Sequence, residues 1–237
     1  MGTLNSSSYI GGELDIFAEA VRWKAYFGRL LRPYLGERVL EVGAGLGATT
    51  AALCSGRERE WWCLEPDPAL LAHIEARLRT SRLPPCCRAV PGALQDVPAS
   101  ARFDTILYID VLEHIEDDRA ELERAAARLL PGGHLIVLAP ACPALYSPFD
   151  RAIGHYRRYT RAALQALTPP QTRLIVLRHL DSLGFFLSLA NRSLLRQSMP
   201  SRRQILFWDR LLTPLTRLSD WLVRYTFGRS LLAVWEA

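Results

Sequence analysis

The sequence predicts an α/β protein built on a parallel sheet with helices on both faces. Two observations carry this prediction: short apolar runs alternate with helical patterns along much of the chain, and turn residues separate them. With 237 residues, 49% of them hydrophobic and 22% charged, the chain can bury a substantial core without disulfides or metals. The same composition excludes a disordered tail protein and a collagen-like chain.

The expected elements follow one another in order. A helical pattern over residues 13–35 precedes the first apolar run, and Asp67 with Pro68 provides an N-cap and a first-turn proline after the second run. A further helix is expected over 116–130, before a turn at 131–133. The expected strands are 38–42, 61–65, a weak third strand ending at Val90, 103–109, 134–139, 173–180 and 230–235.

Between the last two strands lies a segment that the sheet does not need, residues 182–229, and we expect a helical insertion there. Ser201 and Gln204 fit a capping box. An apolar stripe recurs at helical spacing and comprises Trp208, Leu211, Leu215, Leu218, Leu222 and Tyr225. Four arginines recur every seven residues: Arg203, Arg210, Arg217 and Arg224. We expect the stripe to be buried against a binding cavity or a partner surface, with the arginines at the mouth of that cavity.

The insertion also carries most of the positive charge. Its eight arginines against Asp209 and Asp220 give +6, so the rest of the chain sums to −1. A charge this local favours an anionic or interfacial partner, including peripheral contact with a membrane, over nucleic acid. The near-apolar run 183–190 is too short to span a bilayer, and the N-terminus has no signal-peptide pattern.

The cysteine pattern favours a reduced, cytoplasmic compartment. The count is odd, and no C-x-x-C pair or other zinc spacing occurs. The five cysteines are Cys54, Cys63, Cys86, Cys87 and Cys142.

A glycine-rich loop follows the first expected strand. Gly43, Gly45 and Gly47 permit a tight turn and a close ligand, and the helix that begins after them offers free N–H groups. Twenty residues after Gly45, Glu65 ends the next strand, where a carboxylate can accept hydrogen bonds from both hydroxyls of a ribose. The loop also satisfies the G-x-G-x-x-A form of a dinucleotide fingerprint, through Ala48.

Three further features favour a different cofactor. Glu41 precedes the loop, where its charge suits an ammonium or sulfonium group and repels a pyrophosphate. The fourth expected strand leads into the run DVLEHI at 110–115, and LPGG stands at 130–133. Together these motifs resemble the class I S-adenosylmethionine-dependent methyltransferases over residues 36–180 and the final strand. The resemblance implies a Rossmann-like, doubly wound seven-stranded sheet in the order 3-2-1-4-5-7-6 with strand 7 antiparallel.

The resemblance also implies an organisation and roles for residues. We expect a single domain over 1–237, with a lid helix (1–35), a cofactor-binding core (36–181), the insertion and a last strand (230–237). The expected cofactor-binding residues are Tyr9, Glu41, Gly43, Ala44, Gly45, Gly47, Glu65, Pro66, Asp67, Ala93, Leu94, Ile109, Asp110 and Val111. One departure is that Ala93 stands where relatives often place an acid for the adenine amino group. The backbone of Leu94, or Asp96 reaching back, would replace that acid.

Two runs are candidates for the acceptor side. In the first, Asp110-x-x-Glu113-His114 resembles the E-x-x-E-H run with which some family members bind a divalent metal, His155 being an additional candidate; we expect no metal here. In the second, the G-H-x-R-R-Y element of a bacterial subset of the family spans 154–159. His155 is a candidate general base. Arg157 and Arg158 either clamp an anionic group or brace the loop by pairing with Asp150.

The sequence thus predicts an enzyme that transfers methyl groups from S-adenosylmethionine to a small-molecule or lipid-like acceptor. The expected catalytic residues are His114, His155, Tyr156, Arg157 and Arg158. The alternatives are aminopropyl transfer or cyclisation from the same cofactor, a metal-dependent O-methyltransferase, a non-catalytic cofactor-binding module and an NAD(P) oxidoreductase.

Overall fold

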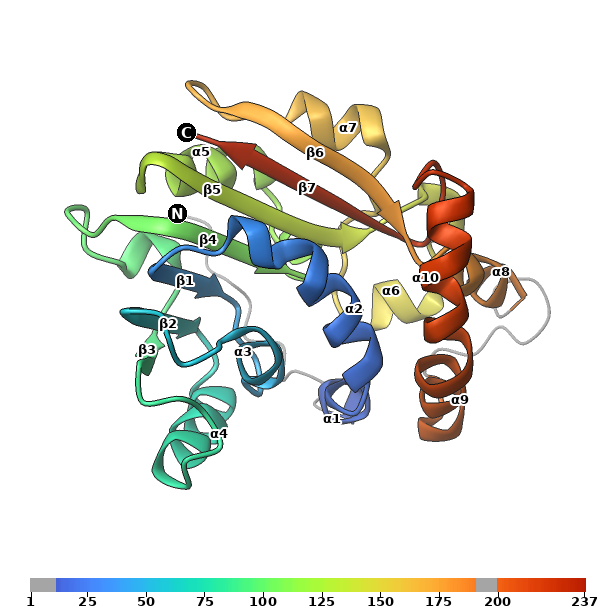
Figure 1. Ribbon diagram of the computed structural model, residues 1–237, viewed down its shortest axis with the longest axis horizontal. Coiled ribbons are helices and arrows are strands. Elements are labelled where there is room, and N and C mark those ends of the chain that lie inside the picture. The colour runs from blue at the N-terminus through green and yellow to red at the C-terminus, as the bar shows by residue number, and fades with distance from the viewer. Residues whose placement is uncertain (1–11, 191–199) are drawn as a thin grey trace.

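A seven-stranded sheet in the order β3-β2-β1-β4-β5-β7-β6 forms the centre of the computed structural model, which describes residues 12–190 and 200–237 (Figure 1). The strands are β1 (Arg38–Val42), β2 (Glu60–Glu65), β3 (Cys87–Pro91), β4 (Phe103–Ile109), β5 (Leu129–Pro140), β6 (Arg173–Leu180) and β7 (Ser230–Glu236). Strands β1 to β5 pair in parallel, and β7 is antiparallel to both β5 and β6. The predicted strand order is confirmed.

Helices cover both faces of the sheet, because apolar side chains point alternately to the two sides of each strand. One core cluster contains residues of α2, α3, α4 and α9, and the other contains residues of α5 and α7. The α-helices are α1 (Gly12–Ala18), α2 (Val21–Leu31), α3 (Ala48–Leu53), α4 (Pro68–Arg79), α5 (Asp118–Ala126), α6 (Pro148–Ala152), α7 (Arg161–Ala166), α8 (Ser182–Ala190), α9 (Arg202–Phe207) and α10 (Thr213–Leu222). A π-helical turn, η6 (Trp208–Leu212), joins the last two.

Two predicted helices differ from the structure. The helix expected over 13–35 is divided into α1 and α2, and Lys24 closes the break by donating from Nζ to the carbonyls of Phe17 (2.6 Å) and Ala20 (3.4 Å). The helix expected over 116–130 ends at Ala126, because β5 already begins at Leu129. The glycine turn at 131–133 lies inside β5, where the pairing of β5 with β4 shifts its register.

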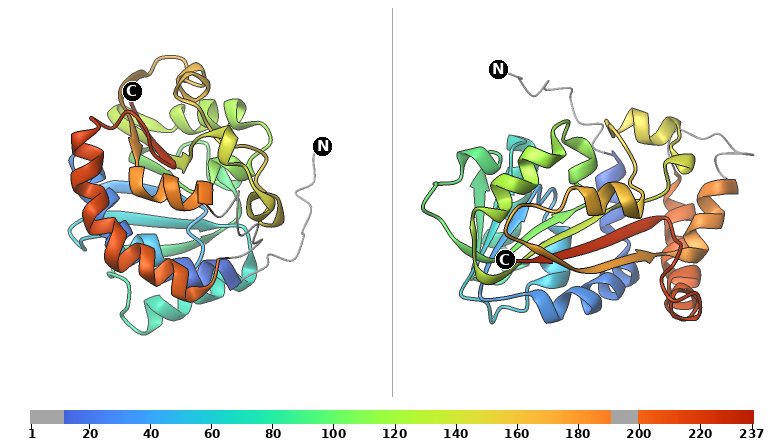
Figure 2. Two further views of the ribbon diagram at one scale, coloured as in Figure 1. Left: turned by 90° about the vertical axis from the view of Figure 1, so that its right-hand side faces the viewer. Right: turned by 90° about the horizontal axis from the view of Figure 1, so that it is seen from above.

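The insertion places α9 and α10 end to end at the outer side of the molecule (Figures 1 and 2). The inward face of the insertion carries buried polar side chains beside the core residues Ile205 and Trp208. Asp209 accepts hydrogen bonds from the backbone N–H groups of Trp23 (2.8 Å) and Arg22 (3.2 Å), at the start of α2. Asp220 accepts from the N–H of Asp181, the N–H of Ser182 and the hydroxyl of Tyr26, each at 2.8 Å. These two carboxylates therefore tie η6 and α10 to α2 and to the start of α8. The capping box of Ser201 and Gln204 is confirmed.

The outward face of the insertion is apolar, so the expected burial of the stripe was wrong for most of its members. Leu211, Leu215, Leu218 and Leu222 are 57–63% exposed, whereas Trp208 is 2% exposed. Since the inner side of the helix is occupied by hydrogen-bonding residues, its leucines face solvent. Of these four leucines, Leu218 lines a groove between α2 and α10.

A buried carboxyl group joins β1, β2 and α3. Glu41 is 2% exposed, and its Oε2 accepts hydrogen bonds from Thr50 Oγ1 (2.7 Å) and Trp61 Nε1 (2.8 Å). Burial raises the pKa of Glu41 from its ordinary value to about 7, against the effect of these two donors.

This raised pKa predicts a pH dependence of stability. Because folded Glu41 keeps its proton up to about pH 7 while the unfolded chain releases it near pH 4.5, its contribution to stability is complete below pH 4.5 and is lost as the pH rises to about 7. We expect Glu41→Gln to reduce this loss by about 3 kcal/mol, on the scale of ~1.4 kcal/mol for each pKa unit. Urea unfolding of both proteins at several pH values measures it, and identical pH profiles would contradict the expectation.

Candidate functional site

The loop between β1 and α3 has the backbone that a closely bound ligand requires. Gly43, Gly45 and Gly47 have φ of +67°, +56° and +68°, a region that other residues seldom adopt. A Cβ at Gly43 would lie 2.7 Å from Val111 Cγ2, so this glycine also lets the chain after β4 approach the loop. The loop therefore needs glycine for its backbone conformation and, at Gly43, for a close approach of the chain.

Glu65 connects this loop with the end of β2. It is 5% exposed, and its two oxygens accept from Gly45 N (2.7 Å) and Asp67 N (3.0 Å). Burial raises its pKa, although these N–H groups oppose the shift. Each carboxylate oxygen keeps a further acceptor site. These remaining acceptor sites fit the two ribose hydroxyls, as donors, of the cofactor that the sequence implies.

Asp110 stands at the end of β4, on the same edge of the sheet. Its φ is +54°, and its N–H donates to Leu138 O at 2.7 Å, which fixes the backbone. The side chain is accessible to solvent, yet desolvation by the surrounding protein raises its pKa, while the charges of His155, Arg229 and Lys24 lower it. An accessible carboxyl in such surroundings suits a cationic ligand group. The neighbouring Ile109 is half-buried.

For Glu41 the structure corrects the sequence prediction of direct contact with the cofactor. Its carboxyl group is buried and bonded to Thr50 and Trp61, so it does not face solvent. The geometry instead favours a positioning role, in which Glu41 holds α3 behind the glycine loop.

Lys24, the one lysine of the chain, escaped the sequence analysis as a site residue. It is 9% exposed, and burial lowers its pKa to about 8, while the charge of Asp110 opposes this shift. A buried ammonium group on the helix that follows α1 thus contributes to the electrostatics of Asp110. Its lone occurrence among 29 basic residues was the available signal.

The remaining predicted cofactor residues surround the same edge. Asp67 caps α4 by accepting from Ala69 N (2.7 Å), as expected. Asp96 does reach back, but to Ala93 N at 2.8 Å, and the Leu94 side chain is fully buried. Ala44 is buried, and Pro66 is exposed. Tyr9 lies outside the described residues.

On the acceptor side, a buried aspartate organises the chain around α6. Asp150 is fully buried and accepts from Ser147 N and Oγ (2.8 Å each) and from Arg158 Nε (2.7 Å) and Nη2 (3.1 Å). His155 Nδ1 lies 3.0 Å from Asp150 Oδ1. Although burial opposes it, the hydrogen bonds of His155, Arg158 and Ser147 and the charge of Arg158 hold the pKa of Asp150 well below its usual range. A charged Asp150 favours the His155 tautomer with its proton on Nδ1.

The pKa of Glu113 is shifted in the opposite direction to that of Asp150. Glu113 is fully buried, neither of its carboxyl oxygens has a hydrogen-bond partner among the described residues, and Oε1 lies 3.7 Å from His155 Nε2. Burial, reinforced by Asp110, raises its pKa well above the usual value. Burial also lowers the pKa of His114 to about 4. The His114 ring lies edge-on to the His155 ring, with ring centroids 4.6 Å apart. Ligand atoms of Glu113, His114 and His155 lie within 4.8 Å of one another, so this cluster can hold a metal ion.

The arginines of the G-H-x-R-R-Y element are engaged by the protein. Arg158 pairs with Asp150, which supports the bracing alternative, whereas Arg157 pairs with Asp118 (2.7 Å) and not with Asp150. For the alternative of a clamp on an anionic substrate group, both guanidinium groups are already paired with carboxylates of the protein. Tyr156 is 55% exposed beside Arg157.

Comparisons with known proteins agree with this architecture. Residues 40–135 match the family model described as a methyltransferase domain. A ubiquinone biosynthesis O-methyltransferase of Xylella fastidiosa is 32% identical over 106 residues, which cover 44% of this chain and 42% of that protein. The chain therefore matches about two fifths of the length of this curated relative.

Solved structures share the fold at low sequence identity. A geranyl diphosphate methyltransferase in complex with SAM has a TM-score of 0.63 at 13% identity, covering 98% of this chain and 92% of that chain. The N-methyltransferase NodS of Bradyrhizobium japonicum, in complex with S-adenosyl-L-homocysteine, has a TM-score of 0.58 at 17% identity, covering 92% and 87%. The matched region, the strand order and the glycine loop together identify a methyltransferase domain over residues 40–135.

Proposed function

We propose that the protein transfers a methyl group from S-adenosylmethionine to a hydroxyl group of a small, lipid-like acceptor. The observation that carries this proposal is the Asp150–His155 pair, which lies beside Asp110 at the edge of the sheet that holds the glycine loop and Glu65. The name of the Xylella relative, an O-methyltransferase of ubiquinone biosynthesis, supports oxygen as the acceptor atom and a lipid-like acceptor.

The cofactor supplies an electrophilic methyl group on a sulfonium centre. Glu65 and the glycine loop position it, and much of the rate enhancement of such a displacement comes from alignment. His155 Nε2 accepts the proton of the acceptor hydroxyl as the new C–O bond forms, while Asp150 holds the ring by its Nδ1 and stabilises the resulting imidazolium. The displaced sulfide leaves neutral, so it needs no proton.

A metal-dependent variant of the same reaction is the second candidate. Both carboxyl oxygens of Glu113 are without a hydrogen-bond partner among the described residues, and Asp150 holds the far ring nitrogen of His155, as carboxylates commonly hold metal-binding histidines. Glu113, His114 and His155 would hold a divalent ion, which would polarise the acceptor hydroxyl. We favour the metal-free form because burial raises the pKa of Glu113, so that an ion would have to displace a proton to bind there.

The insertion supports a location at a membrane surface. The outward face of η6 and α10 presents Leu211, Leu215, Leu218, Trp221 and Leu222, each at least 57% exposed. The exposed ionisable residues between 202 and 224 are all arginines: Arg202, Arg203, Arg210, Arg217 and Arg224. An apolar helical face flanked by positive charge is typical of helices that lie in the interface of an anionic bilayer.

A groove next to this face fits the same partner. It has a volume of about 490 Å³ between α2 and α10 and is lined by Tyr26, Arg29, Leu30, Pro214, Arg217, Leu218, Trp221 and Tyr225. Two guanidinium groups beside apolar and aromatic side chains suit a lipid phosphate with its acyl chain. A second copy of this chain would bring arginines against arginines, so we take an anionic bilayer as the partner. Within the described residues, no helix is both long and apolar enough to cross a membrane.

Glu65→Ala tests the cofactor site. Loss of two charge-assisted hydrogen bonds, worth about 1.5–3 kcal/mol each, should weaken S-adenosylmethionine binding at least tenfold in calorimetry. The variant should keep its circular dichroism spectrum, and Glu123→Ala, at an exposed position on α5, is the matched control. Unchanged affinity in Glu65→Ala would remove this residue from the site.

His155→Gln tests the proton acceptor. With a long-chain catechol in detergent micelles as the acceptor, we expect turnover to fall roughly 10²–10⁴-fold, with S-adenosylmethionine affinity unchanged. Raising the pH should partly rescue the variant, because more of the phenol is then ionised. Wild-type turnover should survive a strong chelator. Loss on chelation with rescue by a divalent ion would favour the metal-dependent candidate, and full activity of His155→Gln would contradict both.

Flotation with vesicles tests the membrane contact. The protein should float with vesicles containing phosphatidylglycerol and not with neutral ones, and less at high salt, because screening acts beyond ~8–10 Å at physiological ionic strength. Leu218→Ser with Trp221→Ser, or Arg210→Gln with Arg217→Gln, should abolish flotation, whereas Arg79→Gln on α4 should not. Flotation unaffected by these changes, or a dimer that buries Trp221 without flotation, would refute the contact.

A further inference from the structure

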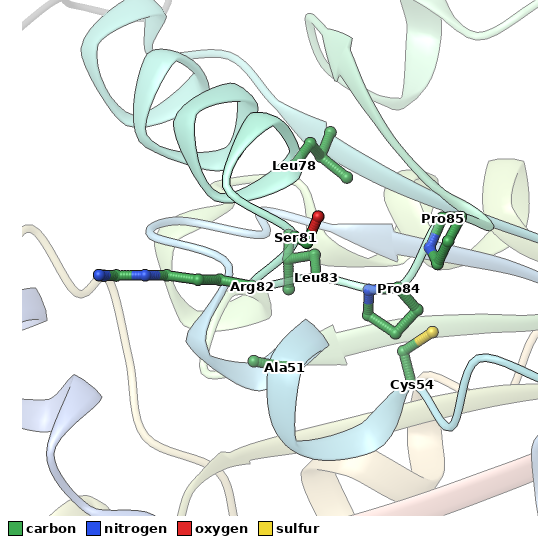
Figure 3. Close-up of a pocket in the computed structure, with 8 residues that line it drawn as sticks. All are labelled: Ala51, Cys54, Leu78, Ser81, Arg82, Leu83, Pro84 and Pro85. Atoms are coloured by element: carbon green, nitrogen blue, oxygen red, sulfur yellow. The ribbon is translucent and has the colours of Figure 1, made fainter.

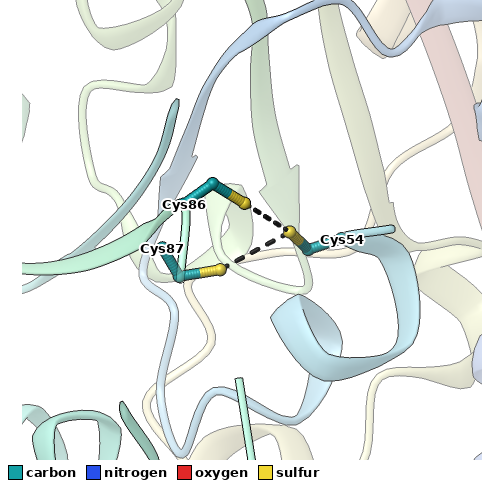
Figure 4. Close-up of side chains that lie close together, drawn as sticks. All are labelled: Cys54, Cys86 and Cys87. Atoms are coloured by element: carbon teal, nitrogen blue, oxygen red, sulfur yellow. Dashed lines mark hydrogen bonds between the residues drawn. The ribbon is translucent and has the colours of Figure 1, made fainter. Parts of the chain in front are cut away.

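Three cysteines that the sequence analysis treated separately lie together in the structure (Figure 4). Cys54 directly follows α3, while Cys86 and Cys87 lie at the start of β3. Cys54 Sγ is 3.5 Å from both Cys86 Sγ and Cys87 Sγ, and all three sulfurs lie within 4.8 Å of one another. The pattern was invisible in the sequence, since more than thirty residues separate Cys54 from the adjacent pair.

The spacing of the sulfurs suits one metal ion. Four ligands at the usual Zn–S distance of ~2.3 Å stand about 3.8 Å apart in a tetrahedron. The two measured separations of 3.5 Å are within a few tenths of an ångström of this value. Small side-chain rotations would therefore bring all three sulfurs onto one ion without moving the backbone.

A carboxylate lies in reach as a fourth ligand. Glu58 Oε2 is 3.4 Å from Cys54 Sγ. The N–H groups of Ser55 (3.1 Å) and Gly56 (2.9 Å) and the hydroxyl of Ser55 (2.9 Å) donate to the same carboxylate and fix its position. Although burial opposes it, these hydrogen bonds lower the pKa of Glu58, so an anionic oxygen is present at neutral pH.

An ion can reach the cluster from the surface. A cavity of about 530 Å³ opens beside Cys54 and is lined by Ala51, Cys54, Leu78, Ser81, Arg82, Leu83, Pro84 and Pro85 (Figure 3). Cys86 is half-buried, whereas Cys54 and Cys87 are buried. The cluster is thus largely buried, yet an ion can reach it from solvent through this cavity.

The cluster is separate from the cofactor site. Cys87 begins β3 and Glu60 begins β2, so the thiols lie at the edge where these parallel strands start. The glycine loop, Glu65 and Asp110 lie where the strands end. Changes at the thiols can therefore be read independently of S-adenosylmethionine binding.

We propose that Cys54, Cys86 and Cys87 bind a zinc ion as thiolates, with Glu58 as the fourth ligand. Binding replaces the thiol protons by the metal and releases them to solvent, with no change of oxidation state. The bound ion links the end of α3 to the start of β3. It stabilises the fold in this way, because the unfolded chain holds the two segments far apart.

The test uses the full chain, reduced and freed of metal, titrated with Zn²⁺ against a chromophoric chelator. We expect one tightly bound equivalent and a rise in Tm. Co²⁺ should give sulfur-to-cobalt charge-transfer absorption and the intense visible bands of a tetrahedral site. Cys54→Ser and Cys87→Ser should each weaken binding at least tenfold and abolish the rise in Tm.

Cys142→Ser is the matched control, because Cys142 lies outside the cluster and should leave the stoichiometry and the Co²⁺ spectrum unchanged. Should Cys87→Ser fail to fold, Glu58→Gln and Cys86→Ser, at less buried positions, provide the same comparison. Equal zinc binding in wild type and Cys54→Ser overturns the proposal. The proposal is also overturned if the reduced protein binds no Zn²⁺ and mass spectrometry of the untreated protein finds Cys54 in a disulfide.

Discussion

The hydrogen bonds of buried aspartates fix how the insertion meets the rest of the fold. Asp181, Asp209 and Asp220 are at most 3% exposed, and they accept hydrogen bonds from other elements, Asp209 from the start of α2 and both Asp181 and Asp220 from α8. A buried carboxylate is stable only when such donors satisfy it, so α10 can adopt just one rotation about its axis. In that rotation its polar side faces inward and its leucines face outward.

The same constraint reaches the cofactor side through α2. Asp209 caps α2, Tyr26 of α2 donates to Asp220, and Trp23 packs against Trp208 with ring centroids 5.6 Å apart. Lys24 lies on this helix between them and acts electrostatically on Asp110. The insertion and the edge of the sheet that carries the glycine loop are therefore connected by one helix.

Most of the sheet and the glycine loop could be predicted from local patterns. Apolar runs such as 103–109 mark strands because burial on both faces leaves no alternation, and positive φ at Gly43 needs glycine. The exposure of the apolar stripe could not be predicted from local patterns, because Leu218 has the spacing of a core residue. Only the hydrogen-bond partners of Asp220 decide which side of α10 is buried. The meeting of Cys54 with Cys86 likewise depends on how β2 and α4 fold between them, which residue spacing does not encode.

The acceptor side shows how surroundings, more than residue type, assign chemical roles. Asp150 and Glu113 are both fully buried carboxyl groups close to the His155 ring. Asp150 is charged because Arg158, Ser147 and the ring itself donate to it, whereas Glu113 has no such donor among the described residues and keeps its proton. The ring is therefore held from Nδ1 by a negative charge and faces a neutral group at Nε2. Of the two nitrogens, Nε2 is the one left able to accept a proton, and this polarity is what the proposed transfer to oxygen requires.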